Sequence, residues 1–190
     1  MSIRISAKPV NITIIQVYAL TSTADDREIE DIYCILQQCI DNIRARDMWF
    51  IMGSFNAKVG STKEYVEKRF IGSFGLGERN ERSDRLVEFV SQNCLVIVNT
   101  FLKQHPRRLF TWTFPDENYE NQIDYILAPK RWRTSVAGVK TLPGADCGTD
   151  HELLSAKVNI KLEKGNVLMR YDMTAINDEY KIDVQNVLLN

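Results

Sequence analysis

The stretch Asn121-Gln122-Ile123-Asp124-Tyr125-Ile126 puts one carboxylate inside an apolar run, and this run predicts a β-strand over residues 123–127. A carboxylate that is buried in a strand needs a polar partner. Further along the chain, Thr149-Asp150-His151 offers one, because the Asp124 carboxylate can fix the tautomer of an imidazole. We therefore expect Asp124 and His151 to lie within hydrogen-bonding distance of each other.

The dipeptide Asp150-His151 carries the groups that phosphodiester hydrolysis requires. An imidazole can take a proton from a water near neutral pH, and a carboxylate can bind a divalent cation or orient that water. An Asp-His pair in a loop is more often a capping or surface pair than a site. Its occurrence soon after the Asp124 strand favours a site. The other histidine, His105, precedes a proline and is expected to be a loop residue.

Both signals belong to a longer pattern. It contains Gly53-Ser54-Phe55-Asn56 and residues 15–19, 74–77, 107–113, 121–127 and 143–154. In this order, from about Ile12 to Leu162, the pattern resembles the endonuclease domain of RTE/BovB-type long interspersed retrotransposons. That domain is part of the endonuclease/exonuclease/phosphatase superfamily, which also contains DNase I. The resemblance implies a DNase I-like layered α/β sandwich, with two mixed β-sheets face to face and helices outside.

The resemblance also implies roles for five residues. Tyr18 matches the tyrosine that contacts the scissile phosphate, and Asn56 matches the asparagine that holds the attacked phosphate or water. Asp124 matches the aspartate that orients the catalytic histidine, and that histidine is His151. Asp150 matches a carboxylate that lies next to the bound metal in the family. The implied cofactor is Mg²⁺, the implied partner is DNA, and the implied reaction is nicking of a phosphodiester bond.

Purely structural interpretations of two of these residues stay open. Tyr18 ends an apolar strand, so it could be a tyrosine at the edge of the core, and Asn56 could be a turn residue.

Two departures from the family pattern predict an impaired site. Ser54 stands where the family has an aspartate, and a hydroxyl cannot replace a carboxylate as an anionic base or as a ligand of a hard cation. Loss of a positioned acid or base typically costs on the order of 10²–10⁴ in rate. The family's opening strands, with an asparagine and a metal-binding glutamate, have no match before Ile12, so we expect a domain truncated at the N-terminus. We therefore expect weak or absent Mg²⁺ binding and an impaired or inactive nuclease.

Two further interpretations remain. One is a non-catalytic module that binds nucleic acid or protein, and the other, with less support, is a phosphatase of small phosphoesters. An uncovered sheet edge, which we expect along residues 12–18, would promote self-association.

Composition sets broad bounds. With 190 residues and 44% hydrophobic content, we expect one domain over residues 1–163, followed by a linker and weak helix over residues 164–190. The net charge of −1 gives no global attraction to nucleic acid. Residues 101–140, however, hold seven basic and four acidic side chains interleaved with aromatic residues. That mixture suits a phosphate backbone with stacked bases, and equally a solvated face over an aromatic core.

The cysteines form no Cys-x-x-Cys pair, and the sequence shows no signal peptide or membrane span. A reducing compartment, nuclear or cytoplasmic, is therefore expected.

Hydrophobic periodicity predicts an alternating order of strands and helices. We expect a helix capped by Thr23 and a second helix that opens at Ser83. The expected strands cover residues 12–17, 48–52, 95–98, 110–114, 123–127, 136–141 and 154–160.

Overall fold

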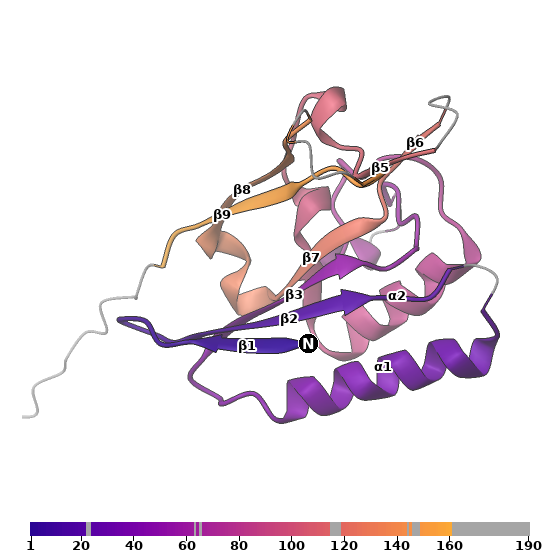
Figure 1. Ribbon diagram of the computed structural model, residues 1–190. Helices are drawn as coiled ribbons and strands as arrows, with labels where there is room; N and C mark the ends of the chain where they lie inside the picture. The colour runs from indigo at the N-terminus through magenta and orange to yellow at the C-terminus, as the bar shows by residue number, and fades with distance from the viewer. Residues whose placement is uncertain are drawn as a thin grey trace, which may run out of the picture.

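The computed structural model describes residues 1–21, 24–62, 64, 66–114, 119–143, 145 and 149–160. A five-stranded mixed sheet forms its centre (Figure 1). In spatial order the strands are β1 (Ser2–Ile5), β2 (Ile12–Tyr18), β3 (Met48–Ser54), β7 (Asp124–Pro129) and β4 (Leu95–Ile97). β2 and β3 are parallel, and the other neighbouring pairs are antiparallel. The predicted boundary between residues 163 and 164 lies outside the described residues.

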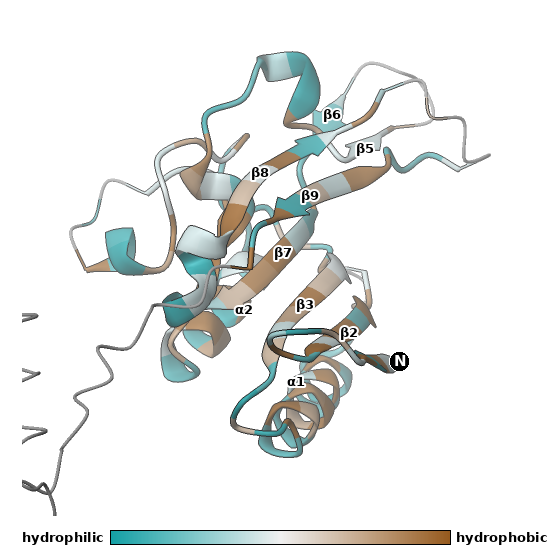
Figure 2. Ribbon diagram, turned by 90° about the vertical axis from the view of Figure 1, so that its left-hand side faces the viewer, coloured by the Kyte–Doolittle hydropathy of each residue, from teal (hydrophilic) through white to brown (hydrophobic). Residues whose placement is uncertain are grey.

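Two helices, α1 (Asp26–Asp41) and α2 (Glu81–Gln92), cover one face of this sheet (Figure 1). Both are amphipathic, and their apolar sides are buried against the sheet through residues such as Ile29, Leu36 and Phe89. The central strands are mostly hydrophobic, whereas α1 alternates hydrophobic and hydrophilic residues along its length (Figure 2). None of the helices in the described part of the chain is long and apolar enough to cross a membrane.

Local side chains set where each helix begins. Asp25 caps α1 in a capping box with Glu28, and the expected cap, Thr23, lies outside the described residues. The predicted start of the second helix at Ser83 is wrong by two residues. Asn80 is the N-cap, because its side-chain oxygen accepts a hydrogen bond from the Ser83 amide.

A second layer packs on the opposite face of the central sheet. It is formed by β8 (Val136–Thr141) and β9 (Leu154–Val158), which meet side chains of the sheet such as Phe50 and Ile126. A short ribbon, β5 (Trp112–Thr113) and β6 (Glu120–Asn121), lies above the ends of the strands (Figure 1). The predicted layered α/β sandwich is confirmed. The prediction of a second mixed sheet is wrong for the described residues, because β8 and β9 pair only with each other and antiparallel.

The predicted open edge at residues 12–18 is also wrong. β1 pairs antiparallel with β2, so the edge of the sheet moves to β1, whose four residues are all exposed. An ion pair holds β1 in place, because Arg4 Nε donates to Asp47 Oδ2 at 2.6 Å. The hydrogen bond from Arg4 lowers the pKa of Asp47 below the usual carboxyl range.

The register of the central strands brings polar residues together at one end of the sheet. Tyr18 of β2 pairs with Ser54 of β3, and Ser54 pairs with Asp124 of β7. Close contact between β2 and β3 at this end depends on Gly53, whose φ is +139°, because a Cβ there would lie 1.9 Å from the Val17 carbonyl oxygen. The sheet therefore aligns three chain segments that are far apart in the sequence.

Candidate nuclease-like site

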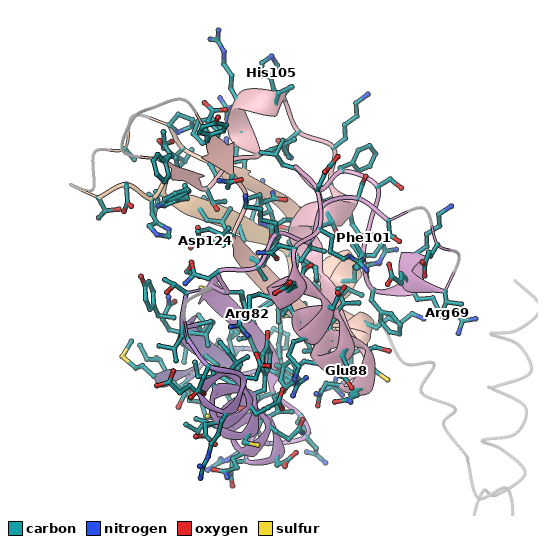
Figure 3. The ribbon with its side chains drawn as sticks, turned by 90° about the vertical axis from the view of Figure 1, so that its right-hand side faces the viewer. Arg69, Arg82, Glu88, Phe101, His105 and Asp124 are labelled. Carbon is teal, nitrogen blue, oxygen red and sulfur yellow. The ribbon has the colours of Figure 1, made fainter. Side chains whose placement is uncertain are left out.

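The imidazole of His151 lies beside the Asp124 carboxylate, as the sequence predicts. His151 Nδ1 is 3.0 Å from Asp124 Oδ2 and 3.2 Å from Oδ1. In Figure 3, Asp124 lies where the upper segments of the molecule meet the ends of the central strands. With Nδ1 engaged by Asp124, Nε2 is the ring nitrogen that remains for a ligand. The expected contact between Asp124 and His151 is confirmed.

Burial dominates the electrostatics of Asp124. Its side chain is only 14% exposed, and loss of hydration raises its pKa above the usual carboxyl range. A hydrogen bond from Thr111, together with the charge and hydrogen bond of His151, opposes this shift. The pKa of Asp124 is therefore set by two opposing effects, since burial raises it and the contacts with Thr111 and His151 lower it.

Two buried residues that the sequence did not single out fix the start of β7. The Thr111 hydroxyl accepts backbone amides from Ile123 and Asp124, each at 3.0 Å. The Asn99 side chain donates to the Asp124 carbonyl at 3.1 Å and accepts the Ile126 amide at 2.9 Å. At the start of β7, these two side chains therefore bind backbone groups that a neighbouring strand would otherwise bind. Thr111 lies within the family-like segment 107–113, which was the available signal for it.

A cleft of about 830 Å³ opens beside His151. Tyr18 lines it and is 69% exposed, so the interpretation of Tyr18 as a core-edge residue is wrong. Asn56 also lines the cleft, has a φ of +49°, and donates from Nδ2 to the Ala19 carbonyl at 2.7 Å. It is thus both a turn residue and part of the cleft lining. Lys58, which the sequence analysis did not select, contributes a positive charge to the wall of the cleft.

Asp150 lines the same cleft, and one oxygen of its carboxylate is hydrogen-bonded to a neighbouring side chain. Asp150 Oδ2 accepts a hydrogen bond from Trp112 Nε1 at 2.7 Å, and its carbonyl oxygen accepts the Thr113 amide at 3.1 Å. The other nearby carboxylate, Glu152, lines a separate hollow of about 270 Å³ that also contacts His151. Asp150 is therefore the one carboxylate among the described residues that line the large cleft.

Ser54 lies between Tyr18 and Asp124 and is only 4% exposed. Its hydroxyl makes no hydrogen bond to any described residue. A buried hydroxyl of this kind is a weak donor set for a hard cation, which prefers several carboxylate or carbonyl oxygens.

The described residues that line the cleft do not fit a resident Mg²⁺, because they offer too few carboxylate and carbonyl ligands. Within the described residues, no group of three or more His, Cys, Asp or Glu side chains is placed to hold a metal ion. Asp150 Oδ2 already accepts a hydrogen bond from Trp112, and Ser54 offers only a buried hydroxyl, so these two residues supply too few oxygen ligands for a metal-dependent step.

Comparisons with known proteins find similarity over most of the chain. The Endonuclease/Exonuclease/phosphatase family model matches residues 2–151. Craniofacial development protein 2 of Bos taurus is 49% identical over 163 residues, which is 86% of this chain and 27% of that protein. The chain thus spans about a quarter of the length of this relative.

Two solved structures share the fold at low sequence identity. The endonuclease domain of TRAS1, a telomere-specific non-LTR retrotransposon, has a TM-score of 0.58 and 16% identity over 82% of this chain and 59% of that one. The 3' phosphatase NExo from Neisseria, bound to a product DNA hairpin, has a TM-score of 0.58 and 14% identity, covering 84% and 65%. The fold is therefore DNase I-like.

Proposed function

Because this chain belongs to the endonuclease/exonuclease/phosphatase family, we propose that its cleft binds a DNA phosphodiester and that hydrolysis is slow or absent. The domain would derive from a retrotransposon endonuclease whose ancestral reaction was Mg²⁺-dependent nicking. The sequence pattern over residues 12–162 supports that origin. We also propose a nuclear or cytoplasmic location.

The observation that carries the proposal is the contact of Asp124 with His151, whose side chain lines the cleft. A carboxylate that holds Nδ1 leaves Nε2 to donate to, or accept from, an oxygen in the cleft. Tyr18, Asn56 and Lys58 line the same space and provide hydroxyl, amide and ammonium groups for a phosphate. These groups bind and orient a phosphodiester without any contribution from a metal.

Slow hydrolysis follows from the oxygen ligands that Ser54 and Asp150 offer to a metal ion. Ser54 supplies a buried hydroxyl without a partner among the described residues, and Asp150 is engaged by Trp112. Both observations favour the alternative of a non-catalytic DNA-binding module over a working nuclease. A phosphatase of small phosphoesters has less support, because a cleft of about 830 Å³ is larger than such a ligand fills.

Binding can be tested without catalysis. We expect Lys58→Gln to weaken binding of a fluorescein-labelled DNA in EDTA, measured by fluorescence anisotropy over a series of salt concentrations. Loss of one phosphate contact should reduce the slope of log affinity against log salt by about one. Lys68→Gln is the matched control, because Lys68 is exposed and does not line the cleft. Unmodified protein that binds no DNA, or equal effects of the two variants, would refute binding in the cleft.

A further inference from the structure

Three aromatic side chains form one wall of the cleft, and we call them the aromatic corner: Trp112, Phe114 and Tyr119. The rings of Trp112 and Phe114 meet edge to face, with centroids 5.6 Å apart and an interplanar angle of 84°. Phe114 and Tyr119 meet in the same way at 6.5 Å and 88°. The Phe114 amide donates to the Tyr119 carbonyl at 2.9 Å, so the backbone fixes the second contact.

The aromatic corner is unusually open to solvent. Phe114 is 45% exposed and Tyr119 is 66% exposed, although each ring already has an aromatic neighbour. Exposed aromatic rings that are grouped in a cleft are typical of binding surfaces rather than of a core. Edge-to-face contacts occupy only part of each ring, so the remaining area can stack on a flat ligand.

The aromatic corner is tied directly to the His151 segment. Trp112 donates from Nε1 to Asp150 Oδ2 at 2.7 Å, and Trp112 and His151 form an isolated backbone bridge. On the other side of this bridge, the Glu152 amide donates to the Thr111 carbonyl at 2.9 Å. A ligand that stacks on the aromatic corner therefore lies next to the phosphate-binding groups of the cleft.

We infer that the aromatic corner is a base-stacking subsite, which makes the cleft selective for an unpaired nucleotide. The inference rests on the proposed function, since it assumes that a DNA phosphate occupies the cleft. A base inside a duplex has both faces covered by its neighbours, whereas a base in a single strand, a frayed end or a mismatch can stack on protein rings. Stacking of this kind tolerates any base, so the selection is for unpaired structure rather than for sequence.

The test compares one DNA sequence in two forms, a short single strand and its blunt duplex, both labelled with fluorescein and titrated with the full chain in EDTA. We expect the single strand to bind more tightly. We expect the double variant Phe114→Leu/Tyr119→Leu to weaken single-strand binding by roughly ten-fold, as base–aromatic stacking energies suggest, with little effect on the duplex. Leucine keeps an apolar side chain but removes the flat ring.

Phe74→Leu is the matched control, because Phe74 is 39% exposed and does not line the cleft. Thermal melting of each variant checks that the fold is kept. Equal binding of the two DNA forms, or equal loss in Phe74→Leu and the double variant, would overturn the stacking subsite while leaving DNA binding intact. Binding of neither form by the unmodified protein would overturn both the proposed function and this inference.

Discussion

Ser54→Ala should stabilise the protein, although it removes a polar residue from the centre of the candidate site. Ser54 is 4% exposed, and its hydroxyl has no hydrogen-bond partner among the described residues. Folding thus removes the hydroxyl from water without replacing the hydrogen bonds that water made. Alanine keeps the Cβ and leaves no methylene-sized cavity.

The size of the effect follows from the desolvation of one hydroxyl. An unsatisfied buried donor or acceptor costs about 1–3 kcal/mol. We take the lower end, because a strand end can relax, and expect Ser54→Ala to raise the free energy of unfolding by about 1 kcal/mol. For a domain of this size, that change corresponds to a rise in Tm of about 2–4 °C.

Ser83→Ala gives a matched comparison, because Ser83 is also fully buried but its hydroxyl donates to the Asn80 carbonyl. Loss of that hydrogen bond should lower stability by roughly 0.5–1.5 kcal/mol. Urea unfolding followed by circular dichroism measures both changes, and an unaltered m-value shows that they concern the folded state. If Ser54→Ala destabilised the protein as Ser83→Ala does, the Ser54 hydroxyl would be hydrogen-bonded in solution, and the assumption of an unsatisfied buried hydroxyl would be wrong.

Three further perturbations test the fold around the site. Burial raises the pKa of Asp124, so the folded state is favoured by the protonated carboxyl. This stabilisation is complete at pH values below the usual carboxyl pKa and is lost as pH rises through the pKa of the folded state. Urea titrations at several pH values should therefore show that Asp124→Asn gains stability relative to the unmodified protein across that window. Gly53→Ala should destabilise by at least roughly 2 kcal/mol in the same assay, because its Cβ would lie 1.9 Å from the Val17 carbonyl and its φ is +139°; a neutral effect would contradict the close contact of β2 and β3. We propose that the exposed edge of β1 promotes self-association, so Ile3→Lys/Ile5→Lys should shift sedimentation velocity toward monomer, and an unmodified protein that is already monomeric at high concentration would refute this.

The sequence predicts the central strands well because apolar residues dominate them. β2, β3 and β7 are short runs rich in β-branched, aromatic and other apolar residues, a composition that is typical of buried strands. The contact of Asp124 with His151 was predictable for a related reason. A carboxylate inside an apolar strand requires a partner, and His151 belongs to the same family-like pattern.

The missed features depend on contacts between distant segments. β1 is only four residues long, so the alternation Ser2-Ile3-Arg4-Ile5 is too short to predict a strand by itself, and its pairing with β2 depends on segments distant in the sequence. The anchor from Arg4 to Asp47 likewise joins residues 43 positions apart. Only Trp112–Thr113 of the expected strand 110–114 forms a β-strand, because the Thr111 hydroxyl turns to bind the start of β7. The bond from Trp112 to Asp150 likewise joins residues 38 positions apart.

The central claim is that the protein keeps the His151–Asp124 contact, whereas the described residues offer too few metal ligands for efficient hydrolysis. Nicking of supercoiled plasmid in the presence of Mg²⁺ tests this claim most directly. The measurement compares the unmodified chain with His151→Ala, and His105→Ala controls for loss of a histidine outside the cleft. We predict that all three proteins nick at the same background rate. Robust nicking by the unmodified chain and by His105→Ala, abolished in His151→Ala, would contradict the account and establish a working nuclease.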